Sequence, residues 1–118
     1  MKRDMDLIRE IMFAVEESDH DPLSWMTLSI DGRSQLEVSY HVQLLDEAGL
    51  ITAVDLSSSD GLHWEPKQLT WDGHEFLDNA RSATTWKRVK QIVAERTGSA
   101  SLDVIQNILT EQATALLT

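Results

Sequence analysis

The sequence contains no cysteine. This absence excludes disulfide frameworks, cysteine-ligated zinc, iron–sulfur clusters and thiol catalysis, and it suits a reducing compartment such as the cytoplasm. The sequence also lacks any apolar run that approaches the roughly 20 residues of a membrane-spanning helix. Its first ten residues, MKRDMDLIRE, mix acids with apolar residues and therefore do not form a secretory signal. We expect a soluble, cytoplasmic protein with no membrane partner.

Basic residues are scarce: 10 Lys or Arg stand against 20 Asp or Glu, a formal net charge of -10. The deficit is concentrated in residues 1–60, which hold 4 basic and 13 acidic residues. A chain of 118 residues that is 42% hydrophobic can fold as one compact domain without disulfides or metal. Its charge, however, disfavours nucleic acid, because cations that displace counterions from phosphates supply most of the nonspecific affinity.

Glycine and proline are also few, and several of them stand where a periodic segment ends. Pro22 cannot continue a helix, Gly49 suits the left-handed end of one, and Asp60-Gly61 favours a hairpin turn. Between these positions, apolar residues recur at helical spacing or alternate. The patterns predict helices at Asp4–Glu17, from the cap Ser34 to Ala48, at 71–81 after the cap Thr70, at Thr84–Arg96 and from Ser99 or Ser101 onward, and strands at Trp25–Ile30, Ile51–Leu56 and Leu62–Leu69.

The helix over 34–48 ends in EAGLI and is followed at once by the predicted hairpin. This order is typical of a winged-helix domain, in which the helix reads DNA and the hairpin forms the wing. One element departs from that pattern, because a strand and a turn replace the second helix of a helix-turn-helix. We therefore expect an α+β, mainly helical fold. It would comprise a winged-helix-like domain over residues 1–82 and a C-terminal helical extension over 83–118 that packs on it or forms a dimer interface.

Three motifs occur in the same order as in one uncharacterised family. MKRDMDLIR, YHVQLLDEAGLI and LTWDGHEFLDNAR, together with Trp86 and the later SLDVI, resemble the domain of unknown function 2513 family of bacterial and prophage genomes. The resemblance covers nearly the whole chain. It implies a similar fold and a bacterial or phage source, and it brings no activity and no catalytic or ligand residues.

The first functional hypothesis is DNA recognition by the helix over 34–48. In this hypothesis Gln43 pairs with adenine, and Ser39 and Tyr40 contact phosphate or a base edge. Arg33 and Lys67 contact the DNA backbone. The protein would then be a small winged-helix transcriptional regulator of prophage or bacterial origin that binds double-stranded DNA as a homodimer.

The alternative hypothesis is an acidic protein-interaction module that has no catalytic activity. Its motivation is the acidic first half of the chain and the outward position expected for Leu44. Glu37, Asp46 and Glu47 would accompany Leu44 in contacting a basic host protein. A phage-encoded inhibitor could in this way occupy the nucleic-acid site of a host factor.

Catalytic and metal-binding patterns are incomplete, so we expect neither an enzyme nor a cofactor or metal site. His74-Glu75 begins an H-E-x-x-H pattern, but Asp78 stands where the second histidine ligand is required. Asp19-His20-Asp21 adjoins Pro22 and is better explained as a loop. The basic cluster Lys87, Arg88 and Lys90, with Arg96, is expected to be a solvated helix face. The four tryptophans, Trp25, Trp64, Trp71 and Trp86, are expected to be core and hairpin anchors.

Overall fold

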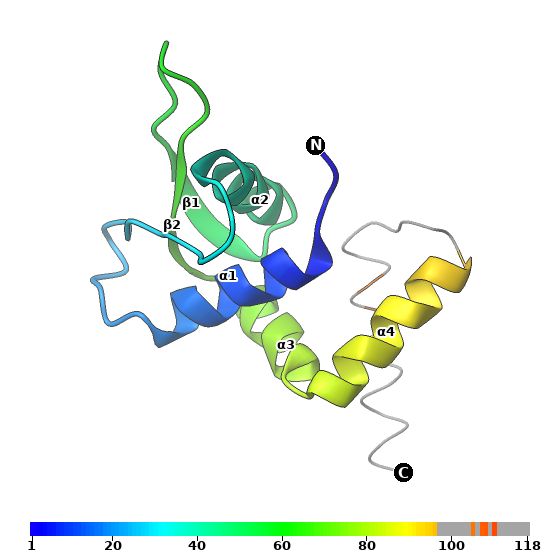
Figure 1. Cartoon of the computed structure of the whole chain (residues 1–118). Coiled ribbons are helices and arrows are strands. Elements are labelled where there is room, and N and C mark those ends of the chain that lie inside the picture. The colour runs from blue at the N-terminus through cyan, green and yellow to red at the C-terminus, as the bar shows by residue number, and fades with distance from the viewer. Residues whose placement is uncertain (97–104, 106, 109, 111–118) are drawn as a thin grey trace. The chain divides into compact units, whose positions relative to one another are not determined.

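The computed structural model describes residues 1–96, 105, 107, 108 and 110. Over these residues the chain forms four helices and one two-stranded antiparallel sheet, an α+β fold that is mainly helical, as expected (Figure 1). It divides into two compact units, residues 1–74 and residues 75–118. No described helix is long and apolar enough to cross a membrane. The elements in chain order are α1 (Met5–Glu17), α2 (Gln35–Glu47), β1 (Ile51–Asp55), β2 (Trp64–Leu69), α3 (Trp71–Ala80) and α4 (Ala83–Arg96).

Helix α1 begins and ends where the sequence pattern predicted. The Asp4 side chain caps it by accepting hydrogen bonds from the N–H groups of Asp6 and Leu7, at 3.0 and 3.2 Å. The helix packs against α2 and β2. The apolar stripe that the spacing predicted is buried throughout: Leu7, Ile8, Ile11, Met12 and Val15.

Helix α2 is also confirmed, and its first turn is held by a capping box. The Ser34 hydroxyl accepts from the N–H of Glu37 at 3.1 Å, and the Glu37 carboxylate accepts from the N–H of Ser34 at 3.3 Å. The helix ends at Glu47, and Gly49 follows with a φ of +75°, in the left-handed region that favours glycine and terminates helices. The apolar residues at helical spacing on its inner side are buried: Val38, Val42 and Leu45.

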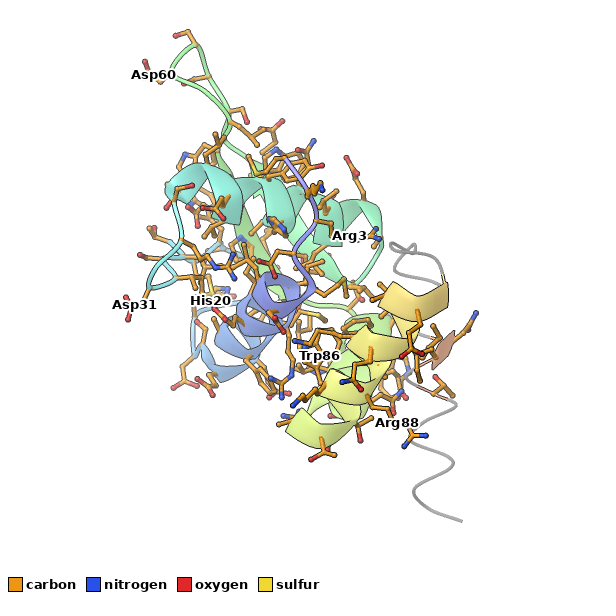
Figure 2. All side chains as sticks on the ribbon, turned by 45° about the vertical axis from the view of Figure 1, so that its right-hand side comes forward. Arg3, His20, Asp31, Asp60, Trp86 and Arg88 are labelled. Atoms are coloured by element: carbon orange, nitrogen blue, oxygen red, sulfur yellow. The ribbon has the colours of Figure 1, made fainter. Side chains whose placement is uncertain are left out.

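The predicted hairpin is present as β1 and β2, with Asp60 at its tip (Figure 2). Ala53 lies opposite Pro66, and Lys67 is the extra residue of a bulge in β2. Pro66 has no N–H to donate to a strand ladder, which explains an irregularity at this point. The N–H of Ala53 instead donates to the Asp46 carboxylate at 3.1 Å, so the bulge links β1 to the end of α2.

The strand predicted at Trp25–Ile30 is wrong. The segment follows β2 without forming a ladder: the N–H of Met26 donates to the Pro66 carbonyl at 3.0 Å, but Pro66 cannot return a bond. The N–H of Leu28 donates at 2.8 Å to the side chain of Glu65 rather than to the backbone of β2. The backbone hydrogen bonds that a third strand needs are therefore not formed, because Pro66 cannot donate one and the Glu65 side chain accepts from the N–H of Leu28 in place of the backbone.

Helix α3 is capped by Thr70, as predicted. The Thr70 hydroxyl accepts from the N–H of Gly73 at 3.0 Å and donates to the Gly49 carbonyl at 2.6 Å. The α4 prediction is also confirmed. In residues 75–96, the rings of Phe76 and Trp86 are buried and meet edge to face at 6.3 Å between centroids. The helix predicted from Ser99 or Ser101 falls mostly on residues outside those described.

The tryptophans do not share one role. Trp86 is buried, as expected, and Trp64 is half-buried on β2. The expectation is wrong for Trp25 and Trp71, which are 47% and 79% exposed. Trp25 follows a turn in the α1–α2 connection, and Trp71 is the first residue of α3, so neither position lies on the inner face of an element.

Candidate functional site

The outward side of α2 is the candidate site. Leu36 is 51% exposed, Glu47 is exposed, and three further side chains between them are half-buried. The spacing of these residues places them on one side of the helix, opposite the buried stripe. We call this surface the α2 outer face: Leu36, Tyr40, Gln43, Leu44 and Glu47.

The opposite side of α2 is fixed by a buried histidine, His41, which the sequence pattern did not single out. His41 is 1% exposed, and its Nε2 accepts from the N–H of Asp4 at 2.8 Å. Its Nδ1–H donates to the Glu37 carbonyl at 2.7 Å, which fixes the neutral tautomer with the proton on Nδ1. The imidazole therefore ties the first turn of α1 to α2 and orients the α2 outer face.

Ser39 does not belong to the surface that was predicted to read DNA. Its side chain is fully buried, and its hydroxyl accepts from the N–H of Trp64 at 3.1 Å. The predicted outward position of Ser39 is wrong because the residue lies on the side of α2 that packs against β2. Its role is to join α2 to the hairpin. Tyr40 and Gln43 remain on the α2 outer face.

Arg33, the cation expected to contact the DNA backbone, is paired within the protein. Its guanidinium donates to the Asp4 carboxylate at 2.6 Å and lies 3.6 Å from that of Glu37. The Asp4 carboxylate raises the pKa of Arg33. Burial by itself would raise the pKa of Asp4, but the bonds from Arg33 and from the N–H groups of Leu7 and Asp6 together hold that pKa below its usual range.

Asp4 gives a testable dependence on pH. Because its pKa is lower in the folded protein, the charge contributes stability above the unfolded pKa of about 3.9, and this contribution is lost as pH falls through the folded value. Asp4→Asn keeps a capping oxygen but removes the charge. We expect it to lower the free energy of unfolding at pH 7 by about 0.5–1 kcal/mol, the size of a screened, partly exposed pair.

Urea denaturation at a series of pH values measures this effect. The difference between Asp4→Asn and wild type should shrink below about pH 4. Asp31→Asn, in the exposed turn before α2, is the matched control and should show no such difference. A gap for Asp4→Asn that stays constant from pH 7 to pH 3 would contradict the assignment.

Lys67 is half-buried at the bulge, and its backbone is held by the loop after α1. The Nε2–H of His20 donates to the Lys67 carbonyl at 2.5 Å, and Nδ1 of the same ring accepts from the Ser18 hydroxyl at 2.6 Å. The interpretation of Asp19-His20-Asp21 as a loop agrees with these bonds. Of the two cations assigned to DNA, one is paired with carboxylates and the other lies on the hairpin rather than on α2.

Of the residues assigned to the acidic alternative, two remain on the α2 outer face. Leu44 is half-buried and Glu47 is exposed. Asp46 accepts from the N–H of Ala53, and Glu37 belongs to the capping box. No basic residue lies in the last turn of α2, so two carboxylates stand at the negative end of the helix dipole.

Glu65 is a buried residue whose carboxylate connects three segments of the chain by hydrogen bonds, a role that the sequence pattern did not predict. Its side chain is 1% exposed and lies among polar partners: its carboxylate accepts from the N–H of Leu28 at 2.8 Å, from His63 Nε2 at 2.9 Å and from the Gln35 amide at 3.4 Å. The only signal was an acid in the middle of a predicted strand. Spacing could not identify Leu28 or Gln35 as partners, because both are at least 30 residues away along the chain.

The other residues that the sequence suggested for metal binding or for a basic surface do not form a metal site among the described residues. His74 and Asp78 are exposed on α3, and Asp78 pairs with Arg81 at 3.0 Å. Among the described residues there is no group of three His, Asp or Glu that could hold a metal ion. In the basic cluster, Lys87 and Arg88 are exposed, and Arg88 projects from α4 (Figure 2).

The comparisons with known proteins agree with the motif resemblance. The family model described as Hypothetical protein (DUF2513) matches residues 2–100. An uncharacterized protein of Haemophilus influenzae (strain ATCC 51907 / DSM 11121 / KW20 / Rd) is 38% identical over 108 residues, which cover 92% of each chain. No solved structure matches the chain.

Proposed function

We propose a function from the surface of the chain itself, because the chain belongs to the family described as Hypothetical protein (DUF2513), a description that names no activity. The chain is a protein-binding module whose α2 outer face contacts a basic partner. The observation that carries this proposal is the chemistry of that face. It presents Leu36, Tyr40, Gln43 and Leu44 beside Glu47 and contains no Lys or Arg. An apolar patch with an acidic edge matches a protein surface with an apolar centre and a basic edge.

The charge of the whole unit supports the same partner. Residues 1–74 hold five Lys or Arg and fifteen Asp or Glu, a balance of -10, whereas residues 75–118 hold five of each. The unit that carries α2 therefore has the entire net charge of the chain. Such a field attracts a cationic partner and increases its association rate at low salt.

The end of α2 provides a local reason for a cationic contact. Asp46 and Glu47 stand at the negative end of the helix dipole, where a basic side chain is usually favourable. A Lys or Arg of the partner beside Glu47 would interact favourably with both the carboxylate and the dipole. The partner class that fits is a nucleic-acid-binding protein, whose phosphate-contacting site already presents clustered cations.

DNA binding is the second candidate, and the order of elements favours it. Helix α2, the left-handed Gly49 and the β1–β2 hairpin follow one another as in a winged-helix domain, and Tyr40 and Gln43 face outward. In this candidate a homodimer acts as a prophage or bacterial regulator. The paired state of Arg33 and the buried Ser39 make it the weaker of the two.

Charge reversal on α2 tests the first candidate. Full-length wild type and the double variant Leu36→Ser/Glu47→Lys are used as baits, and each recovered protein is purified and titrated by calorimetry. We expect wild type to recover a basic protein. The Kd of that protein for the double variant should be about tenfold or more weaker than its Kd for wild type, because an apolar anchor and a favourable charge pair are lost together. The difference should narrow as salt increases.

The controls separate the two candidates. Asp60→Lys makes the same change of charge at the hairpin tip and should leave the Kd unchanged. Fluorescence anisotropy with genomic DNA fragments at low salt should show no binding tighter than micromolar. Binding of a DNA fragment that is lost in Tyr40→Ala/Gln43→Ala would instead support the winged-helix regulator and overturn the protein-binding proposal.

A further inference from the structure

The connection between α1 and α2 carries two large apolar side chains in solvent. Leu23 is 87% exposed and Trp25 is 47% exposed. Both lie in unit 1, on the loop between His20 and Asp31 that Figure 2 labels at its ends. Single exposed apolar residues are common on protein surfaces. Two large exposed apolar side chains within three consecutive residues of an ordered loop, one of them a tryptophan, are typical of a contact site.

The turn that presents them is held by its own hydrogen bonds. The Asp21 carbonyl accepts from the N–H of Ser24 at 2.9 Å and from its hydroxyl at 3.0 Å. The Asp21 carboxylate accepts from the N–H of Leu23 at 2.9 Å. Pro22 presets the backbone between them, so Leu23 is displayed at the third position of a closed β-turn.

Both ends of the turn are also fastened to β2. On one side the His20 ring bonds the Lys67 carbonyl, and on the other the N–H of Met26 bonds the Pro66 carbonyl. The loop is therefore already ordered in the free protein. A preordered loop loses little conformational entropy on binding, which favours its use as an anchor.

The charge around the turn selects the partner. From Glu10 to Gly32 the chain has no Lys or Arg and six acids, and Asp19 and Asp21, which precede Leu23 in the same segment, are exposed. A bacterial membrane surface with anionic lipids would repel these carboxylates. A protein pocket with an apolar floor and basic side chains around it complements both the apolar tip and the acids.

We propose that the turn over residues 19–25 is a protein-docking element that inserts Leu23 and Trp25 into an apolar pocket surrounded by basic residues on a partner protein. The element is separate from the α2 outer face, and the proposal does not depend on that face. It adds a second contact surface to unit 1, built from a loop rather than from a helix.

Site-specific crosslinking tests the proposal with the full-length chain. The photoreactive residue p-benzoyl-phenylalanine replaces Leu23, or Asp60 at the hairpin tip as a control, in cells of the organism that carries the gene. A protein crosslinked from position 23 and not from position 60 is then purified and titrated against wild type and against Leu23→Ser/Trp25→Ser. We expect the double variant to weaken its Kd about tenfold or more, the effect of losing anchor residues.

Three controls make the result decisive. The single variant Leu23→Ser should keep the thermal midpoint of wild type, because the Leu23 side chain is 87% exposed, and it should still weaken the Kd. Asp60→Ser at the exposed hairpin tip, outside both the turn and the α2 outer face, should leave this Kd unchanged. The proposal is overturned if position 23 gives no specific crosslink, if the crosslinked protein binds the double variant as tightly as wild type, or if phosphatidylcholine vesicles, with or without phosphatidylglycerol, bind the chain in a Leu23-dependent way.

Discussion

Replacing Gly73 with alanine is expected to destabilise the protein by about 3 kcal/mol or more, an overpacking effect at the upper end of what single substitutions cause. A Cβ at this position would overlap the Leu50 carbonyl oxygen and lie 2.9 Å from the Leu50 carbonyl carbon. The obstacle is backbone, so no change of rotamer can relieve it. Urea denaturation of the full chain measures the difference.

The Leu50 carbonyl cannot easily move away, because the surrounding bonds fix it. It accepts from the N–H of Thr70 at 3.1 Å, and the Thr70 hydroxyl bonds both Gly49 and Gly73. The turn after α2 and the first turn of α3 thus form one interlocked contact. A Cβ at Gly73 must break some of these bonds or displace the whole contact.

Gly32→Ala is the control for the loss of a glycine. Gly32 has φ +78° and nothing within 4 Å of an added Cβ, so alanine there meets backbone strain and no collision. We expect a cost of about 1–2 kcal/mol at Gly32, from the left-handed conformation alone. If Gly73→Ala is no less stable than Gly32→Ala, the close approach of Leu50 to α3 is not a constraint on the fold.

Sequence reasoning succeeded where the causes of structure are local. Asp4 caps α1, Ser34 and Glu37 lie three residues apart in one capping box, and Gly49 ends α2 in the left-handed region. Each signal involves residues within one turn of each other, and apolar periodicity then identifies the buried side of the helix. The helices, the hairpin and the inner stripe of α2 could therefore be predicted without tertiary information.

It failed where a residue's role depends on a distant partner. Ser39 has the spacing of a flanking surface position, but its hydroxyl is used by Trp64, 25 residues later. Arg33 is a basic residue before a helix, and only the fold brings Asp4 to within 2.6 Å of it. For this reason the predicted outward position of Ser39 is wrong, and the ion pair of Arg33 with Asp4 was not predicted. Alternation and spacing report which side of an element is buried, but they do not identify a polar partner.

The strand predicted at Trp25–Ile30 failed for a related reason. Alternation indicated an extended segment, and the segment does run along β2, but a ladder also needs donors and acceptors on the neighbouring strand. Pro66 removes a donor there, and Glu65 supplies a side-chain acceptor in place of a backbone one.

Removing the Glu65 carboxylate is expected to cause the second large loss of stability. Glu65→Leu should lower the free energy of unfolding by about 2–4 kcal/mol, because the buried N–H of Leu28 loses its acceptor and the polar groups of Gln35 and His63 face an apolar side chain. Urea denaturation measures the loss. In hydrogen exchange, the Leu28 amide should lose more of its protection than the amides within α1.

Glu65→Gln is the control, because its amide oxygen can still accept from Leu28 while the charge is removed. We expect it to cost less than Glu65→Leu and to keep the Leu28 amide protected. Since Leu28 fastens the segment that follows Trp25, Glu65→Leu should also weaken binding through the turn over residues 19–25 more than binding through the α2 outer face. A Glu65→Leu protein as stable as wild type would show that the cost of burying the carboxylate equals the contribution of its hydrogen bonds, and that the turn is held by His20 and Met26 alone.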